Sequence, residues 1–123
     1  MKANELRIGN WIEQSGKHYQ LDENSLIDVL EYWKINKMCL HNSIPLTEEW
    51  LLKFGFVKER GSYIMGVHQS RFSGLMKFKF DPLIQWVFSV GKYKDITRVK
   101  FVHELQNLYF ALTGEELTIK TDI

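Results

Sequence analysis

The sequence predicts an α+β fold built as a single domain over residues 1–123. The chain has 123 residues, 45% of them apolar, which suffices for one hydrophobic core. Predicted helices and strands are segregated along the chain rather than alternating, as in folds with helices packed on an antiparallel sheet. The clearest strand, LMKFKF at 75–80, alternates polar and apolar residues, as a strand with one solvated face does.

An N-terminal β-hairpin is predicted from LRIGNWIE at 6–13 and KHYQL at 17–21. The turn at residues 14–17 contains Gly16, which adopts positive φ without strain.

Residues 22–33 fit either a helix or a strand, and the helix is favoured. Four apolar residues have helical i, i+3, i+4, i+7 spacing: Leu26, Val29, Leu30 and Trp33. Three preceding polar residues are candidate caps: Asp22, Asn24 and Ser25. Residues 34–43 are predicted to connect, with a short strand at 38–40.

A short helix at 47–54 is predicted from IPLTEEWLLKFGF at 44–56. Thr47 is the expected N-cap, and two glutamates follow it in the first turn, where the helix dipole favours negative charge. Leu46 and Leu51 have the spacing of a hydrophobic staple, and Gly55 ends the helix.

Several antiparallel strands are expected in the middle of the chain. A hairpin at 56–60 and 63–67 surrounds Gly61-Ser62, and further strands are predicted at 75–80, 84–90, 96–100 and 117–119, with a turn at 91–95. In the strand at 75–80, Lys77 and Lys79 face one side and Phe78 and Phe80 the other.

The C-terminal helix at 101–113 has the most regular pattern, and we expect it to pack on the sheet. One arc of about 120° holds its apolar residues: Phe101, Val102, Leu105, Leu108, Tyr109 and Leu112. Gly114 stands where a helix ends in a left-handed residue.

The opposite side of this helix is the predicted protein-contact strip. It contains His103, Gln106, Asn107 and Phe110, spaced i, i+3, i+4, i+7. An aromatic residue among polar neighbours is typical of an interface. The alternative is that Phe110 packs under another part of the chain, such as the N-terminal hairpin.

No catalytic, metal or cofactor site is predicted. The glycines lack phosphate-loop spacing, Cys39 and His41 have no second ligand pair, and no serine has a nucleophile-elbow context. A single cysteine, no signal peptide and no apolar run long enough for a membrane span favour the cytoplasm.

Positive charge is concentrated between residues 58 and 100. This stretch has nine Lys and Arg and three Asp and Glu, a net charge of +6 against +1 for the chain. Six basic residues are the candidates for nucleic-acid binding: Lys77, Lys79, Lys92, Lys94, Arg98 and Lys100. The alternation at 75–80 opposes this reading, because base stacking needs aromatic residues on the lysine face.

Three stretches together resemble a family of small uncharacterised proteins from Bacteroidetes genomes and their phages: LRIGNWIE at 6–13, IPLTEEWLLKFGF at 44–56 and VHELQNLYFALTGEEL at 102–117. The resemblance implies a cytosolic bacterial or phage accessory protein and brings no activity, cofactor or functional residue. We therefore expect a non-enzymatic binding or adaptor domain that contacts an unknown protein, with homo-oligomerisation left open. Nucleic-acid binding is the alternative.

Overall fold

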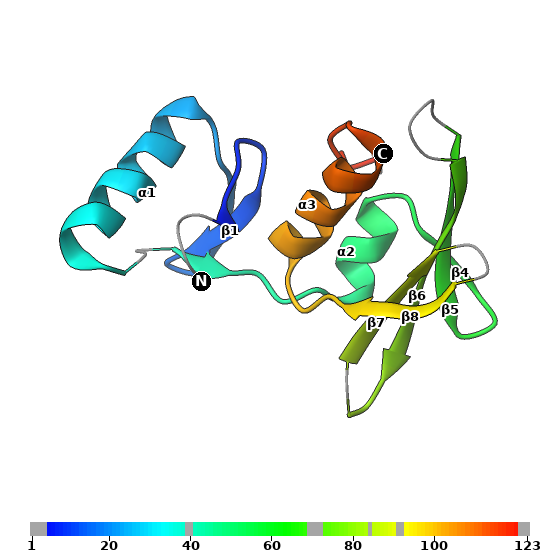
Figure 1. Cartoon of the computed structure of the whole chain (residues 1–123). Helices are drawn as coiled ribbons and strands as arrows, with labels where there is room; N and C mark the ends of the chain where they lie inside the picture. Colours follow the sequence, from blue (N-terminus) through cyan, green and yellow to red (C-terminus); the bar gives the residue numbers. More distant parts are fainter. Residues whose placement is uncertain (1–4, 39–40, 69–72, 84, 91–92, 121–123) are drawn as a thin grey trace.

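The computed structural model describes residues 5–38, 41–68, 73–83, 85–90 and 93–120, without the side chains of residues 68 and 93–96. It confirms the α+β fold: two antiparallel sheets and three helices (Figure 1). The helices are α1 (Glu23–Asn36), α2 (Glu48–Lys53) and α3 (Val102–Thr113).

The smaller sheet has the order β2-β1-β3, and the larger has the order β4-β5-β6-β7-β8. The strands of the smaller sheet are β1 (Trp11–Gln14), β2 (Lys17–Gln20) and β3 (Asn42–Ser43). Those of the larger are β4 (Val57–Glu59), β5 (Ser62–His68), β6 (Ser73–Asp81), β7 (Gln85–Val90) and β8 (Tyr93–Arg98).

The predicted N-terminal hairpin is confirmed as β1 and β2. Ser15 and Gly16 both have positive φ, at 54° and 78°, which is the backbone of a type I′ turn. The first strand is shorter than predicted and begins at Trp11.

The segment at 22–33, which fitted either a helix or a strand, is helical and belongs to α1. Asp22 is its N-cap and forms a capping box with Ser25, and Lys37 ends it in the left-handed conformation. Of its 14 residues, only Val29 is buried. Helix α1 is therefore held to the molecule by a narrow apolar contact.

Helix α2 follows its predicted signals closely. Thr47 accepts a hydrogen bond from the Trp50 backbone N–H, and Gly55 has φ of +100° just after the helix. The Phe56 N–H then donates to the Leu51 carbonyl over 3.0 Å, which returns the chain toward the core.

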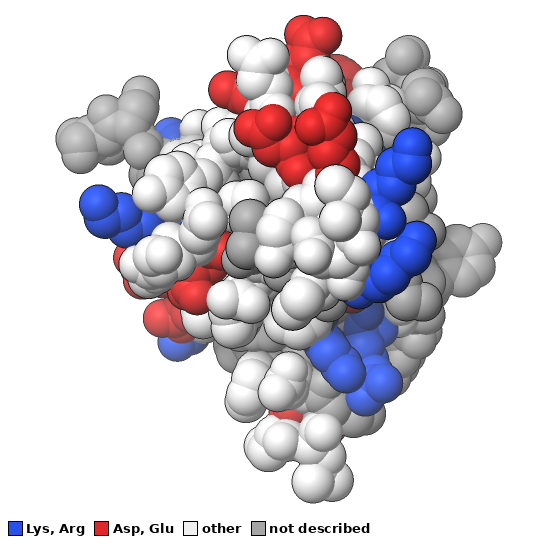
Figure 2. All heavy atoms as spheres, turned by 90° about the vertical axis from the view of Figure 1, so that its left-hand side faces the viewer, with Lys and Arg blue, Asp and Glu red and all other residues white. Residues whose placement is uncertain are grey.

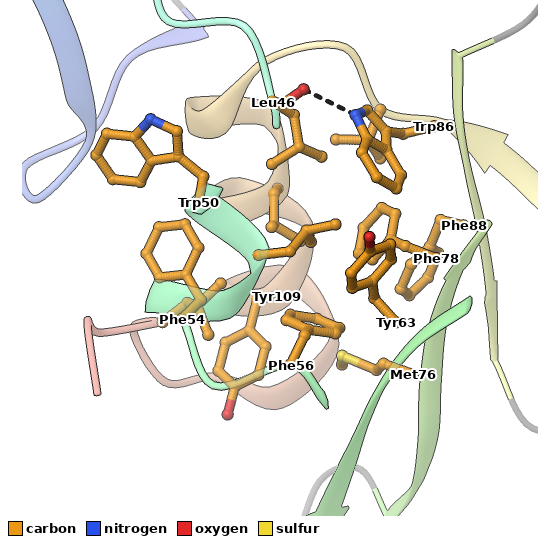
Figure 3. Packing of buried hydrophobic residues seen from close by; sticks show 14 of the residues in the cluster. Leu46, Trp50, Phe54, Phe56, Tyr63, Met76, Phe78, Trp86, Phe88 and Tyr109 are labelled. Carbon is orange, nitrogen blue, oxygen red and sulfur yellow. Dashed lines mark hydrogen bonds between the residues drawn. The ribbon is translucent and has the colours of Figure 1, made fainter. Parts of the chain in front are cut away.

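The main core lies between α2 and α3 on one side and the five-stranded sheet on the other (Figure 3). Its aromatic rings are in contact, for example Phe78 with Phe88 at 5.2 Å between centroids. The Trp86 indole N–H donates to the Leu46 carbonyl over 2.7 Å, so this buried ring is satisfied. A second, smaller cluster comprises Leu6, Ile12, Leu21 and Val29.

Several predicted boundaries are wrong. The tight turn before β5 is Arg60-Gly61, with φ of 49° and 81°, and Ser62 already belongs to the strand. The strand β8 begins at Tyr93, where a turn was expected. The short strand expected at 38–40 does not begin at Met38, which lies in a bend, while residues 39–40 are outside the described chain; β3 follows at 42–43.

Residues 117–119 and Phe80 show two further differences from the predictions. Residues 117–119 form no strand; Leu117 is instead buried in the core, and the Lys120 N–H donates to the Lys53 carbonyl over 2.7 Å. Phe80 is on the core side of β6, yet it is 51% exposed because the strand runs past the core there.

Candidate protein-contact surfaces

The predicted contact strip on α3 is covered by the chain's own N-terminal segment, residues 5–11. Asn107 accepts from the Arg7 guanidinium over 2.7 Å and from the Asn10 amide over 3.0 Å, and donates to the Glu5 carbonyl over 2.7 Å. Arg7 also pairs with Glu116 beyond the end of α3. This face of α3 is thus covered by contacts within the chain.

Gln106 is fully buried in this interface, at 0% exposure, so its polar atoms need hydrogen-bond partners inside the protein. Its carbonyl Oε1 accepts from the Trp11 backbone N–H, and its Nε2 donates to the Gly9 carbonyl, each over 2.8 Å. One side-chain amide therefore satisfies two backbone groups where β1 begins.

His103 is also buried, at 1% exposure. Its Nε2 lies 3.4 Å from the Glu5 carboxylate, and its ring stacks on Phe101 at 6.0 Å between centroids. Within the described part of the chain, its Nδ1 has no hydrogen-bond partner.

Phe110 is the one member of the strip that remains exposed, at 39%. The Arg7 guanidinium lies over its ring, 4.1 Å from the centroid, as in a cation–π contact. The expectation of an outward strip on α3 is therefore wrong for His103 and Gln106, which are buried. Phe110, the residue that the alternative placed under the N-terminal hairpin, is in contact with Arg7 and remains 39% exposed. Nothing in the helical spacing marks the Gln106 amide as the partner of backbone groups some 95 residues earlier.

The outer face of α1 is a surface that the sequence did not single out. It consists of residues at i, i+3, i+4, i+7 and i+8: Ile27, Leu30, Glu31, Lys34 and Ile35. Ile27, Leu30 and Ile35 are 48%, 44% and 80% exposed, and Met38 just beyond the helix is 56% exposed. Since Leu26, Val29 and Trp33 face the small N-terminal cluster, α1 is apolar on two sides.

Figure 2 looks onto the end of the molecule that carries α1. A broad uncharged area lies in its centre, with acidic side chains gathered above and basic side chains along one side. Protein contact sites have this distribution, with an uncharged centre and a charged rim.

The side of the five-stranded sheet away from α2 and α3 is the second uncovered surface among the described residues. We call it the open face; the strand registers place on it Val57, Glu59, Ile64, Leu75, Lys77, Lys79, Val87 and Arg98. Val57 is 61% and Leu75 42% exposed, and both lysines are exposed on the central strand β6. The predicted alternation of Lys77 and Lys79 with buried Phe78 is confirmed.

Among the other basic candidates, Arg98 pairs with Val87 across β7 and β8, which places it on the open face at the edge strand. Arg98 and Lys100 are exposed and line shallow pockets near Phe101, at the end of β8. Lys92 and the side chain of Lys94 lie outside the described part of the chain.

The described aromatic side chains of the larger sheet lie on its core side, not on the open face. Tyr63, Phe78, Trp86 and Phe88 are all buried toward α2 and α3. In the described residues, the open face therefore has lysines without the stacking platform that single-strand binders use.

The pockets near Phe101 contain charges of both signs but no evident ligand site. Glu5, Arg98, Lys100 and Glu104 line the largest of them. The Glu104 carboxylate already accepts the Lys100 and Phe101 backbone N–H groups, at 2.8 and 3.1 Å, so it caps α3. Within the described chain, no three His, Cys, Asp or Glu residues gather as metal ligands.

A buried phenol on β5, the second strand of the larger sheet, has a perturbed acidity. The Tyr63 hydroxyl donates to the Glu48 carboxylate, and this hydrogen bond, with smaller effects of burial and of the carboxylate charge, raises the pKa of Tyr63 to about 12. The same bond lowers the pKa of Glu48, with Lys58 at 3.5 Å adding to the effect and desolvation opposing it. This pair ties α2 to β5 and has the geometry of a structural contact.

No family model, curated protein or solved structure matches this chain. In the described residues, the helices are too short or too polar to span a bilayer. The candidate sites therefore depend on the geometry alone.

Proposed function

We propose that this chain is a non-enzymatic protein-binding domain whose contact element is α1. The observation that carries the proposal is the outer face of α1, where Ile27, Leu30 and Ile35 are 44–80% exposed on a helix with a single buried residue. Exposed apolar residues clustered on one helix face are typical of a contact site, since a solvated helix gains nothing from them.

The weak attachment of α1 supports the same proposal. A helix of 14 residues is marginal alone in water, so most of its stability comes from packing. Among the described residues, the apolar side chains of α1 that pack against the small cluster are Leu26, Val29 and Trp33. A partner that covers the outer face supplies the missing burial, as in recognition of an amphipathic helix.

We also propose a biological setting for this chain. The resemblance at 6–13, 44–56 and 102–117 favours a cytoplasmic accessory protein of a bacterium or its phage, acting as an adaptor. The docking of residues 5–11 on α3 then has a structural role: it fixes the module that presents α1.

Site-specific photo-crosslinking tests the proposal. A photoreactive amino acid at position 35 is expected to give a discrete protein adduct in cells, resistant to nuclease and sensitive to protease. The matched control is position 83 in the turn after β6, where Leu83 is 94% exposed but isolated from α1. Equal labelling at both positions, or none at position 35, contradicts the proposal.

Nucleic-acid binding through the basic stretch remains the second candidate, favoured by Lys77 and Lys79 on the open face. It requires retention on heparin or single-stranded DNA that falls steeply with salt and is lost in Lys77→Glu/Lys79→Glu. No retention at low salt disposes of it.

A further inference from the structure

We propose that the partner of α1 is a second copy of this chain, and that α1 of one copy docks on the open face of the next. The inference rests on the proposed function, since it names the partner of the same helix. It joins the two surfaces that the described chain leaves uncovered, one at each end of the molecule (Figure 1).

The two surfaces have complementary charges. The exposed side of α1 has Glu23, Asp28 and Glu31 against the single Lys34, a net charge of −2. The open face has Lys77 and Lys79 at its centre, on the middle strand of five, with Glu59 on β4 and Arg98 on β8 toward its edges. Opposite charges around an apolar contact orient two surfaces and suppress other pairings.

The apolar parts also correspond. Ile27, Leu30 and Ile35 run along one side of a helix about 21 Å long. The open face offers Val57 and Leu75, with half-buried Ile64 on β5 beside Lys77 and half-buried Val87 on β7 beside Lys79. Lysine stems lie flat over such residues while their ammonium groups reach outward, where the carboxylates of α1 would meet them.

Topology decides how copies assemble. Figure 1 shows α1 at one end and the sheet at the other, with α2 and α3 between them, so a chain cannot close this contact on itself. The contact is heterologous: each copy has one donor surface and one acceptor surface, which generates rings or open chains rather than an isologous dimer.

Two variants separate the surfaces. Ile27→Ser/Ile35→Ser removes the apolar contact of α1, and Lys77→Glu/Lys79→Glu reverses the charge of the open face. Each is expected to weaken association at least about tenfold, because each removes two central side chains. Lys77→Arg/Lys79→Arg keeps the charge and Leu83→Ser changes an unrelated exposed site, so both controls should associate like the wild type.

Sedimentation across a concentration series gives the decisive result. The wild type should exceed dimer mass as concentration rises, and each disrupted variant should stay monomeric with unchanged circular dichroism. An equimolar mixture of the two variants should form a 1:1 dimer and nothing larger, since only one intact α1 and one intact open face remain to meet.

Other outcomes overturn the inference. A wild type that is monomeric throughout excludes a second copy, and an adduct at position 35 with a different protein would then leave the proposed function standing. Undiminished association of Lys77→Glu/Lys79→Glu indicates pairing of α1 with α1, and undiminished association of Ile27→Ser/Ile35→Ser indicates a contact elsewhere. No adduct at position 35 removes the proposed function itself.

Discussion

Gln106→Met should destabilise the protein by about 2–4 kcal/mol, although the substitution barely changes side-chain volume. Gln106 is fully buried and satisfies the Trp11 N–H and the Gly9 carbonyl, each over 2.8 Å. A buried backbone group left without a partner costs about 1–3 kcal/mol, and both groups here are partly buried, so we take the lower half of that range for each. Methionine keeps the packing and removes both bonds.

Phe110→Ala is the matched comparison on the same helix face. Phe110 is 39% exposed and makes its described contact with the Arg7 guanidinium, so we expect a loss of about 1 kcal/mol. Urea unfolding followed by circular dichroism measures both free energies, with equal m-values as the check that neither variant changes the extent of unfolding. A loss below about 0.5 kcal/mol for Gln106→Met, or a larger loss for Phe110→Ala, would refute the docking of residues 5–11 on α3.

Four further substitutions test the scaffold in three comparisons. Gly55→Ala should cost more stability than Gly16→Ala: φ is +100° at Gly55 and a Cβ would stand 2.9 Å from the Lys120 side chain, whereas nothing lies within 4 Å at Gly16, where φ is +78°. Tyr63→Phe should abolish a phenol ionisation near pH 12 in near-ultraviolet absorbance; because the folded pKa is raised, the stabilisation is complete below pH 10 and is lost as pH rises through about 12. Trp86→Phe should cost about 1–3 kcal/mol in thermal or urea unfolding, since it leaves a buried carbonyl without its donor. Equal losses for the two glycines, an unchanged phenol titration or a neutral Trp86→Phe would each contradict the corresponding contact.

Local chemistry made much of the fold predictable. The inner face and glycine end of α3, the Thr47 cap of α2 and the type I′ hairpin depend on residues within a few positions of one another. Phe80 shows where this fails: its parity in β6 is right, but its burial depends on how far the core extends under the strand, which alternation does not encode.

The candidate site was predictable only in part. Helical spacing correctly grouped His103, Gln106, Asn107 and Phe110, yet it does not show that the chain returns to cover them from residues 5–11. On α1, the spacing of Leu26, Val29, Leu30 and Trp33 predicts one apolar side. Leu30 also belongs to a second apolar side, which this spacing does not show. Ile27 and Ile35, eight residues apart and out of phase with that template, were the available signal.

Amide hydrogen exchange of α1 tests the central claim most directly. In dilute protein alone, the α1 amides should exchange quickly, since one buried residue anchors the helix, while the α3 amides stay protected. The measurement is repeated with the partner that crosslinks at position 35, or at high protein concentration if that partner is a second copy. Exchange of the α1 amides should then become slow, and exchange of the α3 amides should stay the same. Association that leaves α1 exchange unaltered, or that slows exchange only elsewhere, would contradict α1 as the contact element.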